Sequence, residues 1–392
     1  MNRRNFLKLT AVGAVSFAVQ ALCSQSIRTL ITSLIAGNGS GTVKPMGLST
    51  LGPIPPALST TLPAPTNTIL PTETPTQAPA YVATPSSQVT LDAVGDIMLG
   101  RTVGQQVLAK GPQIVFAGVQ LGLAVSDIRV GNLECSLTNL GTPAKKMYTM
   151  QAPPAAAMVL SQGKFDLVSL ANNHSMDYGY IGLADEQKTL DKAGIATVGA
   201  GVNFDLAHTP SLLERNGLRL AFLAYVDVPV EQNGFDTHTW VATADQPGLA
   251  WGDPYQIKID VAAARRQADV VVVLLHSGIE IGKYLPTISA NQRADAYAAI
   301  DGGAALVLGA HPHVLEPIER YHGGLIAFSL GNFVFDDYQG IANATVILRV
   351  VLTRAGVQSF DYVPVLIDNG LPHVIPDGQV PAIGTMLAPV NP

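Results

Sequence analysis

Side chains that bind metals or transfer protons follow apolar, β-prone runs at five places in this sequence. The residues at these places are Asp96, Asn132 and Glu134, Asn173 and His174, His276, and His311 and His313. In α/β sheets, ligands collect outside the carboxyl ends of the strands, where side chains from distant segments converge. Four of the eight histidines stand at these ends. The pattern therefore predicts one polar site, with metal binding as its chemistry.

The segment 309–313 contains the most specific of these motifs. An extended His-x-His segment points both imidazoles to one side, so His311 and His313 could bind one or two metal ions. The alternative is a pair of surface histidines that flank Pro312. His276 ends the most hydrophobic run of the chain, where a buried polar group needs a specific partner, and Glu280 follows it at i+4.

The junction 170–179 combines two amides, a histidine and an acid, which favours proton transfer by His174 and Asp177 over simple helix capping. Two other segments, 95–101 and 132–134, are also typical of ordinary turns when they are taken alone. In the context of the other motifs, Arg101 is a candidate for bidentate binding of an anion. The remaining histidines are placed in polar loops and receive no role, namely His208, His238, His322 and His373.

Alternating strands and helices must position these residues from residue 88 onward. Between the strands, helices are predicted over 103–109, 116–124, 155–162, 182–193, 256–267 and 291–300. After His313 the pattern changes to a hairpin around Gly323 and Gly324, followed by antiparallel strands at 345–352 and 360–366. Parallel βα units followed by paired strands predict one α/β domain, 88–392, built as a layered sandwich of mixed sheets.

Two non-globular segments precede this domain. Arg3 and Arg4 are followed by an uncharged run, 9–23, that is too short for a comfortable membrane span. This pattern predicts a twin-arginine export signal or membrane anchor over 1–37, whose cleavage stays open. Residues 38–87 are rich in Pro, Thr and Ser, which predicts a disordered linker. We therefore expect an extracytoplasmic domain, either membrane-anchored or secreted.

The composition narrows the classes of function. The chain is 47% apolar and only 13% charged, and its net charge of −6 argues against a nucleic-acid partner, which requires a clustered basic face. One of the two cysteines, Cys23, lies in the signal segment, so Cys135 cannot form a disulfide within the domain.

Taken in order, these motifs resemble the capsule-synthesis CapA family (poly-γ-glutamate synthesis proteins), whose fold is similar to that of calcineurin-like metallophosphatases. The matching stretches are 92–101, 131–138, 169–179, 276–281, 309–319 and 327–336. The resemblance implies a four-layer αββα sandwich. It implies metal ligation by Asp96, Glu134, Asn173, His276, His311 and His313. It further implies His174 as the acid that protonates the leaving group, catalytic roles for Asp177 and Glu280, and substrate contacts from Arg101, Asn132 and Asn332.

This sequence departs from the phosphatase pattern at two positions. Met98 replaces a histidine ligand, and Glu134 replaces a shorter aspartate, or the role of that aspartate passes to Asn132. Ile281 stands where the CapA family usually has an aromatic residue. A thioether is a poor ligand for hard cations, so the number of divalent ions (Mn, Zn or Fe) stays open at two, one or none.

The resemblance implies an exported protein that acts on an extracellular anionic polymer such as poly-γ-glutamate, in its synthesis, export or processing. Metal-assisted hydrolysis or transfer at an amide bond would serve this role, with the membrane and a capsule-synthesis complex as partners. Two alternatives are a metal-dependent phosphoesterase and a non-catalytic, polymer-binding scaffold.

Overall fold

The computed structural model describes residues 87–231, 233–280, 286–336, 340–376 and 381–388. All of these residues belong to one compact unit, Ala80–Pro392. The predicted signal segment, all but the last residue of the predicted linker, and Ile281 lie outside the described residues. No helix in the described ranges has both the length and the apolar character needed to cross a membrane.

The first of two large sheets has eight strands, in the order β18-β17-β16-β1-β2-β5-β6, with β15 paired to β1. Its strands β1, β2, β5 and β6 are parallel, whereas β16, β17 and β18 continue the sheet antiparallel to one another. The bounds are β1 (Gln88–Ile97), β2 (Ile128–Leu133), β5 (Leu167–Ser169), β6 (Ala196–Val198), β15 (Asn332–Val334), β16 (Ala344–Thr353), β17 (Gly356–Asp368) and β18 (Leu371–Val374).

The second large sheet has six strands, in the order β13-β14-β12-β11-β9-β8. Its central strands β9, β11, β12 and β14 are parallel, and an antiparallel strand closes each edge. The bounds are β8 (Ser211–Arg215), β9 (Leu218–Asp227), β11 (Val270–Ser277), β12 (Leu306–Ala310), β13 (Ile318–Tyr321) and β14 (Gly324–Ala327). Two short pairs complete the strands, formed by β3 (Ser136–Leu137) with β4 (Gln151–Ala152) and by β7 (Ala200–Gly201) with β10 (Gly248–Leu249).

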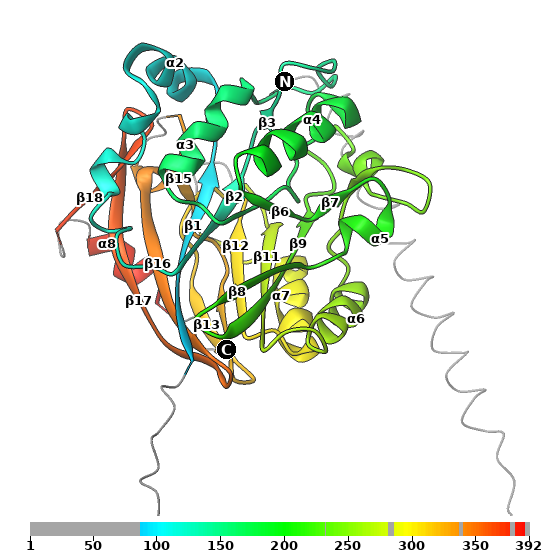
Figure 1. Cartoon of the computed structure of the whole chain (residues 1–392), viewed down its shortest axis with the longest axis vertical. Helices are drawn as coiled ribbons and strands as arrows, with labels where there is room; N and C mark the ends of the chain where they lie inside the picture. The colour runs from blue at the N-terminus through cyan, green and yellow to red at the C-terminus, as the bar shows by residue number, and fades with distance from the viewer. Residues whose placement is uncertain (1–86, 232, 281–285, 337–339, 377–380, 389–392) are drawn as a thin grey trace, which may run out of the picture. The chain divides into compact units, whose positions relative to one another are not determined.

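Helices connect the parallel strands, as the βα pattern predicts. The α-helices are α2 (Arg101–Lys110), α3 (Ala157–Gln162), α4 (Gly179–Lys192), α5 (Phe204–Ala207), α6 (Pro254–Ala264), α7 (Ala290–Gly302) and α8 (Pro381–Met386). Short 3₁₀ turns lie at Pro112–Ile114, Ala117–Val119, Pro154–Ala156, Thr237–Trp240 and Gly340–Asn343. Figure 1 shows α6 and α7 side by side next to β9 and β11, and α3 and α4 next to β2 and β6.

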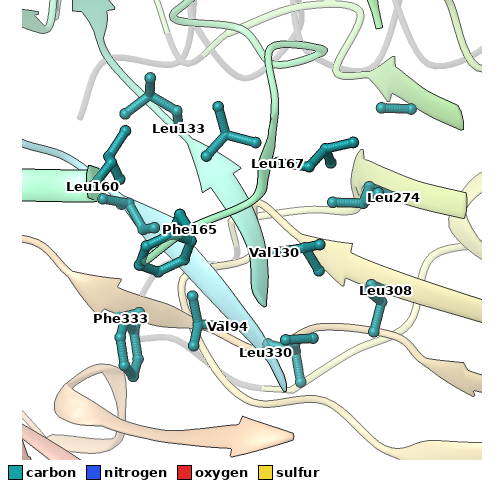
Figure 2. Close-up of a cluster of buried hydrophobic side chains, with 14 of the residues drawn as sticks. Val94, Val130, Leu133, Leu160, Phe165, Leu167, Leu274, Leu308, Leu330 and Phe333 are labelled. Atoms are coloured by element: carbon teal, nitrogen blue, oxygen red, sulfur yellow. The ribbon is translucent and has the colours of Figure 1, made fainter. Parts of the chain in front are cut away.

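Side chains alternate between the two faces of each central strand, so the apolar core is divided into two layers. On β11, Val272 and Leu274 face the first sheet, whereas Val271 and Val273 face α6 and α7. Figure 2 shows side chains of both sheets, among them Val130 and Leu308, in the layer between the sheets. Each sheet thus buries two apolar faces, which stabilises the layers by about 25 cal/mol for each Å² of buried apolar area. The architecture is a four-layer αββα sandwich, as expected.

Two glycines allow the close approach of strands near the ends that carry the polar residues. A Cβ at Gly95 would lie 1.8 Å from the Gly331 carbonyl oxygen, and one at Gly309 would lie 1.8 Å from the Phe328 carbonyl oxygen. Asp96 directly follows Gly95, and His311 is the second residue after Gly309. The close approach is therefore part of what places both side chains.

The periodicity of apolar residues over 116–124 gave a wrong prediction of secondary structure. This segment was predicted as a helix, but the structure forms a 3₁₀ turn at Ala117–Val119 and further turns. Its glycines, Gly118 and Gly122, lower helix propensity, and both pack closely against β16 or the β18 strand. The other predicted helices are present with bounds that shift by a few residues.

Replacement of Gly309 by Ala should force β12 and β14 apart, because the neighbouring atom is backbone and cannot rotate away. We expect a loss of about 1–3 kcal/mol in the free energy of unfolding, measured by urea titration. Gly384→Ala is the matched control, since a Cβ there meets only the Tyr362 hydroxyl oxygen at 3.5 Å. Equal stability of the two variants would contradict the proposed constraint.

Candidate metal and acid–base site

The predicted site residues converge at the carboxyl ends of the parallel strands of both sheets. In the first sheet, Asp96 of β1 pairs in register with Asn132 of β2 and with Asn332 of β15. In the second sheet, His276 is the penultimate residue of β11 and pairs in register with Ala310 at the end of β12, from which the chain continues to His311. The His311 backbone N–H donates a hydrogen bond to Asp96 Oδ2 at 3.2 Å, which joins the two sheets.

Glu134 lies at the centre of the cluster and is completely buried. Its Oε1 atom is 3.7 Å from His276 Nε2, 3.9 Å from His313 Nε2 and 3.9 Å from His174 Nε2. Two triads have ligand atoms within 4.8 Å of one another, Glu134–His276–His311 and Asp96–Glu134–His313. Glu134 belongs to both triads, so it can contribute to one metal ion or bridge two.

The donor atoms at this centre fit a cation. Within the described residues, neither carboxylate oxygen of Glu134 has a hydrogen-bond partner, and His311 Nδ1 has none either. A buried carboxylate without a partner is costly, and a cation is the usual remedy. Two ligands about 2.1 Å from one ion are separated by roughly 3 to 4 Å, which matches the distances around Glu134.

Burial sets the protonation state of the cluster. The pKa of Glu134 is well above its usual range, because of desolvation and then the neighbouring Asp96 carboxylate. Desolvation lowers the pKa of His276 well below its usual range, and His311 and His313 add to this shift. Desolvation is also the main reason that the pKa of His311 falls to about 4. Neutral imidazoles are the form that binds a metal.

Amide side chains hold the histidine of β11. Asn132 Nδ2 lies 2.8 Å from Asp96 Oδ1 and 3.0 Å from His276 Nδ1. Asn173 Oδ1 lies 2.8 Å from His276 Nε2. The Asn132 side chain is further fixed by Asn172, whose Nδ2 donates to Asn132 Oδ1 at 3.1 Å. Asn132, predicted to contact substrate, therefore positions the cluster in this structure.

His174 forms a separate acid–base unit that faces the cluster. Its Nδ1 atom lies 2.8 Å from Asp177 Oδ2, so Nε2 is the nitrogen directed at Glu134. Asp177 is fixed in turn by the Met150 backbone N–H, which donates to Oδ2 at 2.6 Å. A carboxylate on one imidazole nitrogen orients the ring for proton transfer at the other.

Sequence reasoning missed Lys146, whose side chain is buried beside this unit. Its Nζ atom is 2.7 Å from Asp177 Oδ1 and 2.5 Å from Glu231 Oε1, and it donates to the Asn173 carbonyl oxygen at 2.6 Å. It also lies 5.0 Å from the ring centroid of Trp240. Lys146 and Glu231 come from irregular loops without apolar periodicity, so no sequence signal marked them.

The predicted extended His-x-His geometry was wrong. His311 and His313 both have left-handed backbones, with φ of 99° and 59°. Such φ values are uncommon outside glycine and are tolerated where the surrounding structure enforces them. His313 is held by Asn332, whose Oδ1 lies 2.8 Å from His313 Nδ1. Asn332, predicted to contact substrate, thus orients a histidine, and the loop rather than strand pleating brings both imidazoles to the site.

The structure also places Arg101, Glu280 and His208. Arg101 is 43% exposed and forms an ion pair with Asp336 at 3.1 Å, outside the hydrogen-bonded cluster. Glu280 lies beside His313, with Oε1 3.5 Å from Nε2. Burial would raise the pKa of Glu280, but His313, His311 and His174 together lower it to about 2. His208, expected in a polar loop, is buried against Asp260 at 2.7 Å.

Fold and site together describe a layered α/β protein with a histidine–carboxylate centre at the strand ends. The sequence profile of the family described as "Bacterial capsule synthesis protein PGA_cap" matches residues 90–337. The chain belongs to this family. The matched range contains every residue of the cluster described above, together with Lys146 and Glu231.

Two named relatives agree with this assignment. The chain is 35% identical over 282 residues to the PGA biosynthesis protein CapA of Bacillus subtilis, covering 71% of this chain and 72% of the relative. It is 33% identical over 298 residues to the capsule biosynthesis protein CapA of Bacillus anthracis, covering 74% and 70%. A crystal structure of a phosphatase from Mycoplasma pneumoniae aligns with a TM-score of 0.45 and 12% identity, over 72% of this chain and 95% of that one.

The Glu134→Gln variant tests whether the Glu134 carboxylate is a ligand for a cation. In chelator the variant should be at least as stable as the parent, because burial raises the pKa of Glu134 and disfavours its ionised form, which glutamine does not have. With Mn²⁺ the parent should gain stability and the variant should gain much less. Urea unfolding measures both, and Glu214→Gln, on the exposed edge of β8, is the control. Equal stabilisation of parent and variant by Mn²⁺ would exclude Glu134 as a ligand.

Proposed function

We propose that this protein is an exported enzyme that cleaves or transfers amide bonds of an extracellular anionic polymer such as poly-γ-glutamate. The observation that carries the proposal is the His174–Asp177 unit, whose free nitrogen faces a buried carboxylate ringed by imidazoles. Acid–base and metal-ligating groups side by side are what hydrolysis of an unreactive amide requires. The relatives named for PGA and capsule biosynthesis support the polymer as substrate class.

Asp96, Glu134, Asn173, His276, His311 and His313 would hold the divalent cation. When bound there, it supplies a Lewis acid beside the scissile carbonyl and lowers the pKa of water. His174 protonates the leaving amine from Nε2, and Asp177 keeps the opposite nitrogen protonated and fixes the ring. Lys146 holds Asp177 and Glu231 in place, so Asp177 keeps the His174 ring in a fixed orientation.

The charge of the site also fits a cation-dependent reaction. Five carboxylates converge here, those of Asp96, Glu134, Asp177, Glu231 and Glu280, and the Lys146 ammonium group contacts two of them, Asp177 and Glu231. A polyanion would be repelled from such a site at short range. Bound cations would reverse the local potential and provide a place for the polymer carboxylates.

Replacement of His311 by Ala should lower bound metal and abolish turnover together, because it removes a ligand. Replacement of His174 by Ala should leave the metal content nearly unchanged and slow turnover by about 10²–10⁴-fold, because it removes the proton donor. Elemental analysis and the chain length of poly-γ-glutamate after incubation measure the two effects. His322→Ala, an exposed histidine paired with Asp301, is the matched control.

Each alternative has a distinct outcome in the same experiment. Activity of parent protein in chelator, without stoichiometric metal, would overturn the metal mechanism. Turnover of p-nitrophenyl phosphate with no shortening of the polymer would favour a phosphoesterase. Binding of the polymer without any turnover would favour a scaffold of a capsule-export complex.

Export through the twin-arginine pathway is the second part of the proposal, and it rests on Arg3 and Arg4 ahead of the uncharged run. Replacement of both arginines by lysine should leave the precursor in the cytoplasm, as measured by cell fractionation and immunoblotting. Replacement of Lys8 by Arg, which keeps the pair and the charge, is the control. Normal export of the double variant would refute this route.

A further inference from the structure

A second group of polar side chains lies on the opposite face of the six-stranded sheet from His276. Asp227 and Ser277 are register partners at the ends of β9 and β11. Tyr225 and Leu275, two residues earlier on each strand, belong to the core under α6 and α7. Because side chains alternate along a strand, Asp227 and Ser277 point to the same helix-covered side.

Asp295 of α7 meets these residues from the helix layer. It is 1% exposed, and neither of its carboxylate oxygens has a hydrogen-bond partner in the described part of the chain. Asp295 and Asp227 both lie close to Gly252, because a Cβ at Gly252 would lie 2.8 Å from Asp295 Oδ2 and 3.0 Å from Asp227 Cβ. The side chains of Asp227 and Asp295 therefore share one small volume beneath Gly252.

Ser277 provides an independent observation of the same kind. Its side chain is buried, at 2% exposure, and its Oγ atom also lacks a hydrogen-bond partner among the described residues. Buried hydroxyls and carboxylates are normally satisfied, and each exception requires an explanation. The Ser277 hydroxyl lies on the same side of the strand ends as Asp227, and together with the two carboxylates it offers several oxygen lone pairs there.

The surroundings of this group add negative charge. Asp253, which caps the N-terminus of α6, lies near enough to act on Asp295. Burial, followed by the charges of Asp227 and Asp253, raises the pKa of Asp295 to about 8. A hydrogen bond from Asn291 and the charge of His238 partly compensate Asp227, but they do not reach the oxygens of Asp295. A carboxylate in this position favours a cation.

We propose that Asp227, Ser277 and Asp295 form a second cation site, distinct from the histidine cluster. Its donors are oxygen atoms alone, which suit a hard divalent cation such as Ca²⁺ and disfavour zinc or copper. A cation there would join β9, β11 and α7 at one point. The loops that carry Glu231 and Glu280 leave from Asp227 and Ser277, so the cation would fix the bases of both loops.

Terbium luminescence in the full chain tests the site, because Tb³⁺ replaces Ca²⁺ and is sensitised by a nearby indole. Trp251 directly precedes Gly252 and is one of two tryptophans in the chain. Glu134→Gln serves as the background, so that the histidine cluster contributes little. We expect Tb³⁺ emission to saturate at one site per chain and to be competed by Ca²⁺. In Trp251→Phe the emission should be lost, whereas Ca²⁺ should still raise the Tm of the protein.

Asp295→Asn and Ser277→Ala, added singly to the same background, should weaken binding by about tenfold or more, because each removes a donor. Asp301→Asn, an exposed aspartate on α7, is the matched control and should bind as the background protein does. Circular dichroism confirms folding, and Ser277→Ala carries the test if Asp295→Asn does not fold. Absence of sensitised emission, or unchanged binding in Ser277→Ala and Asp295→Asn, would overturn the proposal.

Discussion

The Glu134 carboxylate is buried among imidazoles, and no described residue forms a hydrogen bond to it. The arrangement around it follows from this constraint. A negative charge in such a place is tolerated only if it is protonated or paired with a cation. Burial keeps two of the neighbouring histidines, His276 and His311, neutral, so these two do not supply that cation. The amides of Asn132 and Asn173 hold the His276 imidazole, and the carboxylate and imidazole atoms of the centre could hold a metal ion.

The two-sheet architecture separates the functions of neighbouring residues on the same strand. On β11, His276 points to the layer between the sheets, whereas Ser277 points toward α7. The strand pleat thus directs consecutive polar residues to two different places, the histidine cluster and the group around Asp295. The loops that follow return to the first site, where Glu280 meets His313 and Glu231 meets Lys146.

The sequence predicted those features that depend on strands, and it missed those that depend on loops. Apolar runs located the strand ends, and the strand-end rule predicted the convergence of Asp96, His276 and His311. Lys146 could not be found, because its role depends on tertiary contacts with Asp177 and Glu231 from other segments. The left-handed backbone at His311 and His313 was equally hidden, since His-Pro-His is compatible with an extended strand.

Under the proposed function, charge would link metal binding to binding of the anionic polymer. Without a cation, ionised carboxylates at Asp96 and Glu280 would oppose the approach of a polyanion, and with a cation they would become ligands or counter-ions. Each ligand would then strengthen the binding of the other, and this coupling is reciprocal by thermodynamic linkage. Lys146 does not substitute for the metal in this respect, because its ammonium group is already engaged by Asp177 and Glu231. The acid–base unit is thus prepared in advance, whereas the charge that would attract a polyanion depends on the cation.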